Sequence, residues 1–404
     1  MYSVRVAYSE VDKGVEKAAD RSSRTLPIAH TCDGPRVCAC STKTPGFCFY
    51  LTFSAALDHS ETAIYSGSVD GSEKPHGRGT LTWKSGDRFE GRFKHGEKEG
   101  KGCFYFSDGS SLGGTFSADE LFGKGIYVFD DGSWQEGQYV HGELNGLVKE
   151  FDNLGNLTFT GNYVENCRHG LCTFYDPYGG TLNGVVDEEG SLTGDSITYW
   201  YPGCELGIRG KFLEGILDRG FLVEMKDKQE EEEKKGDVFE RDVSTKDCIS
   251  ANPLLPDPYE TKMVYVKVSP IAGDGLFARR DLPEDRVVSF YNGIRLTHQE
   301  VDSRDWSQND YTISLDSETV IDIPPSCSDV AAYCASLGHK ANHSFEANCK
   351  YDLFDHPRFG LIKSIRTLKR IRRDEELTVE YGYDHHGLGK NNADAPHWYK
   401  SQLK

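Results

Sequence analysis

The sequence predicts a mainly β protein in which two kinds of β structure follow one another. Through the first half of the chain, two glycines recur together every 23 or 24 residues, which indicates stacked β-hairpins. The second half contains short apolar strands between polar turns, which indicates small antiparallel sheets with few helices. Residues 391–404 have the apolar spacing of a short amphipathic helix.

The glycine repeat extends over about six copies, from residue 61 to about residue 215. One copy reads Phe89-Glu90-Gly91-Arg92-Phe93 and continues through His95-Gly96 to Gly100-Lys101-Gly102. Because a single hairpin of this kind is marginally stable, neighbouring copies are expected to stack and bury their aromatic residues. The unit resembles the MORN repeat. Its two glycines are Gly67, Gly91, Gly114, Gly137, Gly161 and Gly184, and Gly77, Gly100, Gly123, Gly146, Gly170 and Gly194.

The composition limits the classes of partner. The chain has 404 residues and a formal net charge of −18, so a direct nucleic-acid partner is disfavoured and a basic protein partner is favoured. An equally good interpretation is that the acidic residues keep the repeats soluble. Without a long apolar run, a leader-like start or a basic face on the repeats, we expect an intracellular protein that binds no membrane and keeps its cysteines reduced.

Two segments carry no clear periodicity. Residues 1–60 are predicted to be a poorly ordered extension, and their cysteines, Cys32, Cys38, Cys40 and Cys48, lack the paired spacing of zinc knuckles, so no metal site is expected. Residues 216–260 are predicted to be an acidic linker, because the charge block at 226–237 cannot build a core.

Three motifs in the last third of the chain stand in a characteristic order. Residues 338–351 form a polar stretch that contains Asn342-His343-Ser344, and residues 375–384 read as a strand that ends in Tyr381-Gly382-Tyr383. A glycine turn at residues 273–277 precedes both. Together they resemble the SET domain of protein-lysine methyltransferases, here at residues 261–384, with residues 385–404 closing the active site. The resemblance implies that the chain forms a pseudoknot, which brings the last two motifs together.

The resemblance also implies a methyl donor, S-adenosylmethionine, and a role for each site residue, with no metal required. The residues implied to hold the donor are Ala272, Gly273, Asp274, Asn342, His343, Trp398 and Gln402. The residues implied to be catalytic are Tyr381, Tyr291, Tyr351 and His343. The residues implied to contact the substrate lysine and its peptide are Tyr291, Asp302, Lys363, Tyr381 and Tyr383.

The chemistry needs a neutral lysine amine aligned with the methyl group. With a pKa near 10.4, deprotonating a lysine at pH 7 costs roughly 4.6 kcal/mol, and burial beside a cation lowers that cost. Tyrosines at both Tyr291 and Tyr351 leave little room for a methylated product to turn, which predicts mainly monomethylation. Asp274, Gln402 and the Asp310-Tyr311 pair depart from the family pattern, and Tyr311 is the residue that could crowd the site.

The combination of repeats and SET motifs resembles the MORN-repeat SET methyltransferases. This family methylates the histone H3 tail at the lysine four residues from its start and Lys/Arg-Ser/Thr-Lys sites in other proteins. A monomer acting in the nucleus, with the cytoplasm as a second location, is therefore expected. The alternative is a catalytically weak MORN/SET scaffold that binds basic tails, which tail binding without donor binding would favour.

Overall fold

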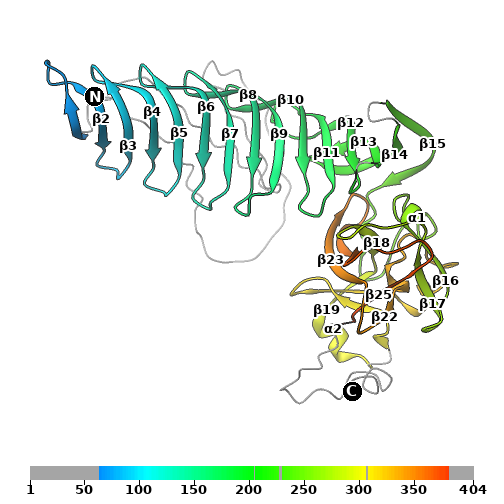
Figure 1. The fold of residues 1–404 in the computed structure, drawn as a ribbon. Helices are drawn as coiled ribbons and strands as arrows, with labels where there is room; N and C mark the ends of the chain where they lie inside the picture. Colours follow the sequence, from blue (N-terminus) through cyan, green and yellow to red (C-terminus); the bar gives the residue numbers. More distant parts are fainter. Residues whose placement is uncertain (1–62, 204, 227–229, 306–307, 382–404) are drawn as a thin grey trace, which may run out of the picture. The chain divides into compact units, whose positions relative to one another are not determined.

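The computed structural model describes residues 63–203, 205–226, 230–305 and 308–381, with the backbone alone for residues 226 and 230–235. It divides into two compact units, residues 1–174 with 184–192 and residues 175–183 with 193–404. The prediction of a mainly β fold, with hairpin repeats followed by small sheets, is confirmed (Figure 1). No helix among the described residues is long and apolar enough to cross a membrane.

The repeats form antiparallel hairpins that pair in chain order (Figure 1). The strands of the first unit are β1 (Ile64–Val69), β2 (Pro75–Thr82), β3 (Arg88–Lys94), β4 (Glu97–Tyr105), β5 (Ser111–Ser117), β6 (Glu120–Val128), β7 (Trp134–Val140), β8 (Glu143–Phe151), β9 (Leu157–Val164) and β10 (Cys167–Tyr175). The strand β11 (Thr181–Val185) contributes residues to both units, and β12 (Gly194–Trp200), β13 (Leu206–Leu213), β14 (Ile216–Lys226) and β15 (Glu230–Glu240) belong to the second.

The two repeat glycines have different physical roles. Gly100 has a φ of +84°, in the left-handed region that glycine adopts without strain, at the irregularity between β3 and β4. Gly91 has no such φ, but a Cβ there would lie 2.5 Å from the Phe89 ring and 2.9 Å from the Cα of Gly102. Because Gly91 has no Cβ, the Phe89 ring can lie across the strands, with its centroid 5.0 Å from the centroid of the Phe116 ring.

Part of the acidity of the repeats serves to pair buried bases. Lys98 is 3% exposed and forms an ion pair of 2.8 Å with Asp119. Arg168 and Glu150 form a second pair, also at 2.8 Å, further along the sheet. Such acids are structural, because removing one would leave a buried cation uncompensated.

The expected linker at residues 216–260 differs from the structure, which places β14 and β15 there as a hairpin. The backbone pairing runs through the charge block, from Arg219 opposite Glu240 to Lys226 opposite Glu230. Backbone hydrogen bonds need no apolar side chain, and the buried Val223 and Phe239 anchor the two strands. The charge block therefore concealed a strand pair.

The SET region consists of three small sheets and few helices. Their orders are β16-β17-β25-β22, β18-β24-β23 and β19-β21-β20. The strands are β16 (Val264–Val268), β17 (Asp274–Ala278), β18 (Val287–Tyr291), β19 (Ile294–Thr297), β20 (Thr312–Ser314), β21 (Thr319–Asp322), β22 (Asn342–His343), β23 (Cys349–His356), β24 (Gly360–Thr367) and β25 (Glu376–Val379). The helical segments are α1 (Glu260–Met263), α2 (His298–Ser303), η2 (Pro325–Cys327) and η3 (Gly338–Lys340).

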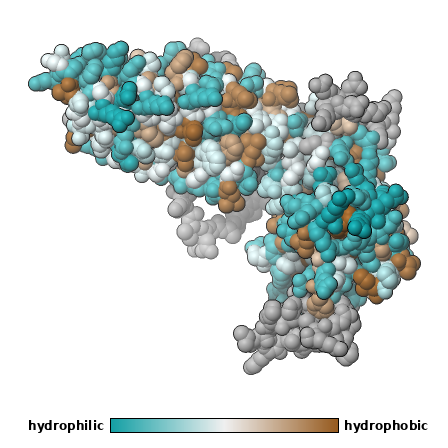
Figure 2. Space-filling model, viewed as in Figure 1, coloured by the Kyte–Doolittle hydropathy of each residue, from teal (hydrophilic) through white to brown (hydrophobic). Residues whose placement is uncertain are grey.

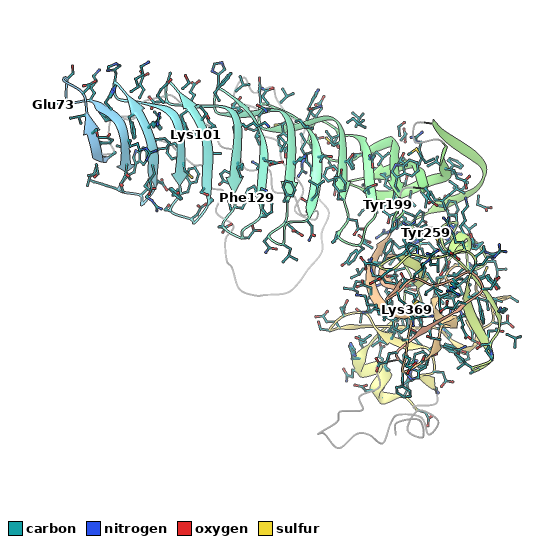
Figure 3. All side chains as sticks on the ribbon, in the orientation of Figure 1. Glu73, Lys101, Phe129, Tyr199, Tyr259 and Lys369 are labelled. Carbon is teal, nitrogen blue, oxygen red and sulfur yellow. The ribbon has the colours of Figure 1, made fainter. Side chains whose placement is uncertain are left out.

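The second unit has a core of aromatic rings around one buried acid. Tyr201 stacks on Tyr259 with centroids 5.0 Å apart, and its hydroxyl donates to Asp257 at 2.6 Å. His356 Nε2 lies 3.1 Å from the same carboxylate, and all three groups are buried. Figure 3 shows how densely side chains fill this part of the protein around Tyr259. The last strands after the repeats therefore share one hydrophobic core with the SET sheets.

We predict that Gly91→Ala will destabilise the repeat sheet by about 1–3 kcal/mol, because the added methyl overlaps the Phe89 ring. Gly113→Ala is the matched control, since its Cβ would meet only Cys103 Sγ at 3.8 Å. The control should change stability by less than about 1 kcal/mol. Urea unfolding followed by circular dichroism measures both, and equal effects of the two substitutions would contradict the packing argument.

Candidate active site

The site is built on a parallel pairing between two very short strands. Asn342 of β22 lies opposite Thr378 of β25, and His343 lies opposite Val379. The amide of Ser344 extends the pairing by donating to the carbonyl of Val379 at 3.0 Å. Residues 342–344 and 378–381, far apart in the chain, therefore lie side by side, as the two sequence motifs predicted.

Tyr381 is fixed by this pairing. Its backbone amide donates to His343 Nδ1 at 3.2 Å, and its hydroxyl donates to the carbonyl of Ala341 at 3.0 Å. The Tyr381 and His343 rings lie 5.3 Å apart. Residues Ala341 and His343 thus set both the position of the Tyr381 backbone and the direction of its hydroxyl group.

Asn342 joins the glycine turn to the same centre. Its side-chain amide donates to the carbonyl of Ala272 at 3.1 Å and to Glu376 Oε1 at 2.9 Å, and it lies 3.3 Å from the carbonyl of Asp274. Gly273 has a φ of +46°, and the direction of its missing Cβ is open, with no atom within 4 Å. Asn342 therefore ties the turn at residues 272–274 to the strand pair, and among the described residues no atom fills the position of the missing Gly273 side chain.

Aromatic residues line a second side of the site. Tyr291 is 4% exposed, and its ring meets that of Tyr351 edge-on with centroids 6.0 Å apart. Its hydroxyl donates to the carbonyl of Tyr311 at 2.6 Å. Burial, with Tyr351 nearby, raises the pKa of Tyr291 well above its ordinary value, so the phenol stays protonated.

His339 is a site-lining residue that the sequence reasoning missed. It is 5% exposed, and its ring lies within 6.3 Å of the ring centroids of Tyr291, Tyr311 and Tyr333. Burial, with Lys340 next to it, lowers the pKa of His339 to about 4, so the ring is neutral at physiological pH. Its position in the motif, three residues before Asn342, was the available signal.

Glu260 is the second residue that the sequence reasoning missed. Its buried carboxylate accepts hydrogen bonds from the hydroxyl of Ser289 and from the amides of Phe290 at 2.8 Å and Leu337 at 3.0 Å. It therefore joins β18, which ends at Tyr291, to the loop that precedes η3. A single acid after a proline-rich turn gave no sign of this role.

The structure brings some predicted residues together and leaves others apart. Ala272, Gly273, Asp274, Asn342, His343 and Tyr381 converge through the bonds described above, and Tyr291 packs on Tyr351. Lys363 of β24 lies opposite Tyr291 of β18. Asp302 is exposed on α2, and none of the described contacts links it to this centre. Tyr383, Trp398, Gln402 and the expected C-terminal helix lie outside the described residues, as do residues 1–60.

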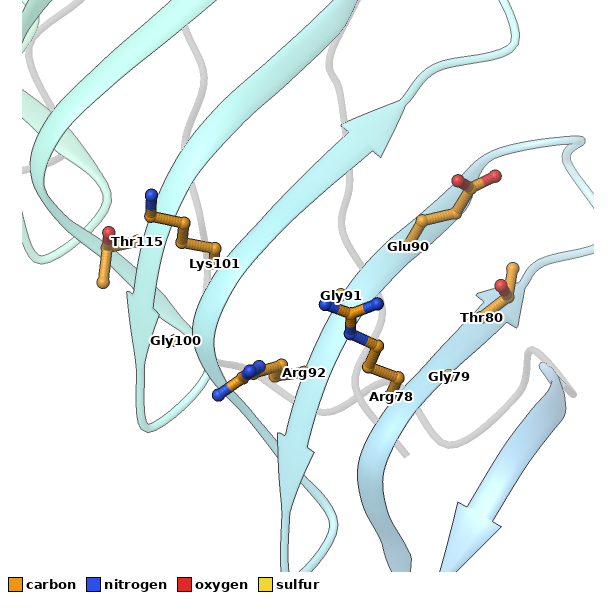
Figure 4. A pocket seen from close by; sticks show the side chains of 9 residues that line it. All are labelled: Arg78, Gly79, Thr80, Glu90, Gly91, Arg92, Gly100, Lys101 and Thr115. Atoms are coloured by element: carbon orange, nitrogen blue, oxygen red, sulfur yellow. The ribbon is translucent and has the colours of Figure 1, made fainter.

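An open groove of about 840 Å³ lies on the repeats and contains none of the predicted site residues (Figure 4). Arg78, Arg92 and Lys101 reach it from three neighbouring strands, accompanied by Glu90. This local cluster of bases differs from the expectation that the repeats lack a basic face. Elsewhere the visible surface mixes hydrophilic and hydrophobic residues (Figure 2).

Comparison with known proteins agrees with the geometry. The SET domain family matches residues 273–382, and the MORN repeat family matches residues 74–88, 89–111 and 114–134. The N-terminal domain of the histone H3 K4-specific methyltransferase SET7 matches residues 163–235. The histone-lysine N-methyltransferase SETD7 of Halocynthia roretzi is 49% identical over 353 residues, which cover 84% of this chain and 92% of that protein. The chain belongs to the SETD7 family of histone-lysine N-methyltransferases.

SET-domain methyltransferases use S-adenosylmethionine, and the SETD7-family site described here fits its amino-acid end. The carbonyls of Ala272 and Asp274 accept from Asn342, a carbonyl oxygen can accept a second hydrogen bond, and a Cβ at Gly273 would meet none of the described atoms within 4 Å. Lys340, 8% exposed, places an ammonium 3.2 Å from Asp274 Oδ2. The zwitterionic amino-acid end of the donor would therefore meet hydrogen-bond acceptors and charges of both signs at this turn.

We predict that Glu376→Ala will weaken donor binding in this SETD7-family protein at least tenfold. Glu376 Oε1 accepts from Ser269 at 2.7 Å and from Asn342 at 2.9 Å, so its loss frees both sides of the cradle. Isothermal titration with S-adenosylmethionine measures the change. Glu346→Ala, at an exposed turn position, is the control and should bind like the native protein. Unchanged affinity in Glu376→Ala would contradict the assigned cradle.

We predict that Glu260 makes the folded state less stable as pH rises. Burial, opposed by the Ser289 and Phe290 hydrogen bonds, raises the pKa of Glu260 from 4.5 to about 8. Its protonated form favours the folded state, so this contribution is fully present below pH 4.5 and is lost as pH rises towards 8. The free energy of unfolding, relative to Glu260→Gln, should therefore fall by a few kcal/mol between these limits. A difference independent of pH would contradict the shift.

Proposed function

We propose that the protein transfers a methyl group from S-adenosylmethionine to the ε-amine of lysine in the histone H3 tail and in Lys/Arg-Ser/Thr-Lys sites of other proteins, mainly once per lysine. The observation that carries this proposal is the direction of two phenols. Tyr291 and Tyr381 each donate their hydroxyl proton to a backbone carbonyl. Their oxygens therefore remain as hydrogen-bond acceptors for an amine.

Bound donor supplies a sulfonium methyl that is already activated by its positive charge. The residues of this chain supply alignment, which lowers the entropy cost of bringing the reacting atoms together. Two fixed phenol oxygens can accept the two N–H groups of a neutral primary amine and so hold its lone pair in one direction. The buried aromatic wall around Tyr291 and His339 also disfavours the ammonium form, because burial penalises charge.

The same hydrogen bonds support a single methyl transfer. A monomethylated amine has one N–H fewer, so presenting its lone pair again requires breaking a bond to a phenol or placing the new methyl against a ring. Tyr291 and Tyr351 pack edge-on, which leaves little freedom for that rotation. Each lost bond to a buried acceptor costs about 1–3 kcal/mol. This barrier favours release of the monomethyl product.

The net charge of −18 supports a basic substrate, because an acidic protein attracts positively charged partners. The relative from Halocynthia roretzi is named a histone-lysine N-methyltransferase. We propose accordingly that the protein acts in the nucleus, where histones are found. Asp302 and Lys363 are proposed contacts to the peptide.

We predict that Tyr381→Phe will lower kcat/KM for an H3 tail peptide at least a hundredfold, because one of the two acceptor oxygens is removed. Tyr291→Phe should instead allow a second methyl to be added, since its hydroxyl no longer holds the amine. Mass spectrometry of the peptide after incubation with S-adenosylmethionine measures both the rate and the product. Tyr265→Phe is the control, because Tyr265 Oη donates to the exposed Asp374, away from the phenols of the site.

Two results would contradict the proposal. If Tyr291→Phe produced only monomethyl lysine at normal rate, the phenol oxygens would not set the product. If no basic lysine peptide were methylated while an H3 tail still bound tightly, the protein would be the binding scaffold instead. Equal loss in Tyr265→Phe would show that the substitutions act through folding.

A further inference from the structure

A cluster of metal-ligand side chains lies in the first repeats, and the methyl-transfer chemistry makes no use of it. Asp70 comes from the turn between β1 and β2, His76 from β2, and His95 from the turn between β3 and β4. One ligand atom of each lies within 4.8 Å of the others.

The backbone holds the three side chains near one another. The amide of Gly96 donates to the carbonyl of Pro75 at 2.9 Å, which fixes the turn that carries His95 beside the start of β2. Asp70 Oδ1 accepts the amides of Ser72 at 2.8 Å and Lys74 at 3.1 Å, so its other oxygen, Oδ2, faces His95 Nδ1 at 2.9 Å. Such outer hydrogen bonds orient a carboxylate ligand.

His76 supplies an independent observation. Its Nδ1 is buried and has no hydrogen-bond partner among the residues that the structure describes. Its ring lies 5.1 Å from the His95 ring, at an interplanar angle of 53°. A buried ring nitrogen without a partner costs free energy, and a metal ion that accepts its lone pair would remove that cost.

A later repeat shows what the arrangement looks like without the third ligand. His141 Nδ1 lies 2.8 Å from Glu120 Oε2, and the amide of Gly142 donates to the carbonyl of Leu121 as Gly96 does to Pro75. The strand position that corresponds to His76 is occupied there by Phe122, which is 56% exposed. The first repeats therefore have a complete set of three ligands where the later copy has two.

We propose that Asp70, His76 and His95 bind a divalent transition-metal ion of the zinc class. Two imidazoles and a carboxylate suit this ion, which prefers nitrogen and oxygen ligands about 2.0–2.2 Å away. Ligand atoms in such a site are about 3.4 Å apart, so three side chains whose ligand atoms already lie within 4.8 Å of one another need only small rotations to bind one ion. The ion replaces the proton shared by His95 and Asp70, and water completes its coordination.

The bound ion would join two turns and one strand at the start of the described sheet. Most residues of β1 are exposed there, and terminal repeats need extra stabilisation because they have a neighbour on one side only. The site is therefore a structural clamp, and it is independent of the proposed methyl transfer.

Titration of tag-free, chelator-treated full-length protein with Co²⁺ tests the site through visible absorption, with Zn²⁺ as competitor. We expect micromolar binding with nitrogen and oxygen character. His76→Ala and His95→Ala should each weaken it at least tenfold, whereas His141→Ala should leave it unchanged. Zn²⁺ should also raise the melting temperature of the native protein and of His141→Ala, but not of His76→Ala.

Three results would overturn the proposal. These are a His76→Ala titration that matches the native protein, binding only at millimolar metal, and a cobalt spectrum that arises entirely from cysteine thiolates. Far-ultraviolet circular dichroism without metal checks that each variant folds. If His76→Ala does not fold, His95→Gln carries the same test, because His95 lies in an exposed turn.

Discussion

The active site depends on a parallel strand pair of only two residues on one side. Such a pair has too few backbone bonds to set its own register. A slip of one residue would move the side chains of Asn342 and His343 each to the other face of the sheet. Asn348 prevents the slip, since its side chain accepts the amide of Thr378 at 2.9 Å and donates to the carbonyl of Glu376 at 2.8 Å. Tyr381 then takes its place from His343. The side-chain amide of Asn348 thus helps to align Tyr381 with Asn342 and the turn at residues 272–274.

The aromatic wall depends in a similar way on one buried carboxyl group. Glu260 accepts from Phe290, next to Tyr291, and from Leu337, two residues before His339. At Gly338, a Cβ would lie 2.6 Å from the carbonyl of Phe290, so the loop approaches β18 as closely as a glycine permits. The two walls of the proposed lysine channel are therefore positioned from the same acid, and the hydrogen bonds from Ser289, Phe290 and Leu337 offset part of the cost of burying it.

The sequence predicted what is periodic or local, and it missed what depends on long-range burial. The repeat glycines have a fixed spacing, so the hairpins followed from it. The convergence of Asn342 with Tyr381 was implied by the resemblance to the SET domain, and no spacing in the sequence showed it. The β14–β15 hairpin was missed because composition reports solvent exposure and says little about backbone pairing. Glu260 and His339 were missed because a lone titratable residue has the same appearance in the sequence whether it is exposed or buried.

The departures from the family pattern gain a physical meaning from these contacts. Tyr311 holds Tyr291 through its backbone carbonyl, which any residue at that position provides. The hydrogen bond that holds Tyr291 is therefore independent of the side chain at 311, although the ring itself lies beside His339, with centroids 6.1 Å apart. Asp274 likewise reaches Lys340 through its carboxylate and Asn342 through its carbonyl. Substitutions at these two positions can change how tightly the donor and substrate bind while the geometry of the phenols stays fixed, because backbone atoms set that geometry.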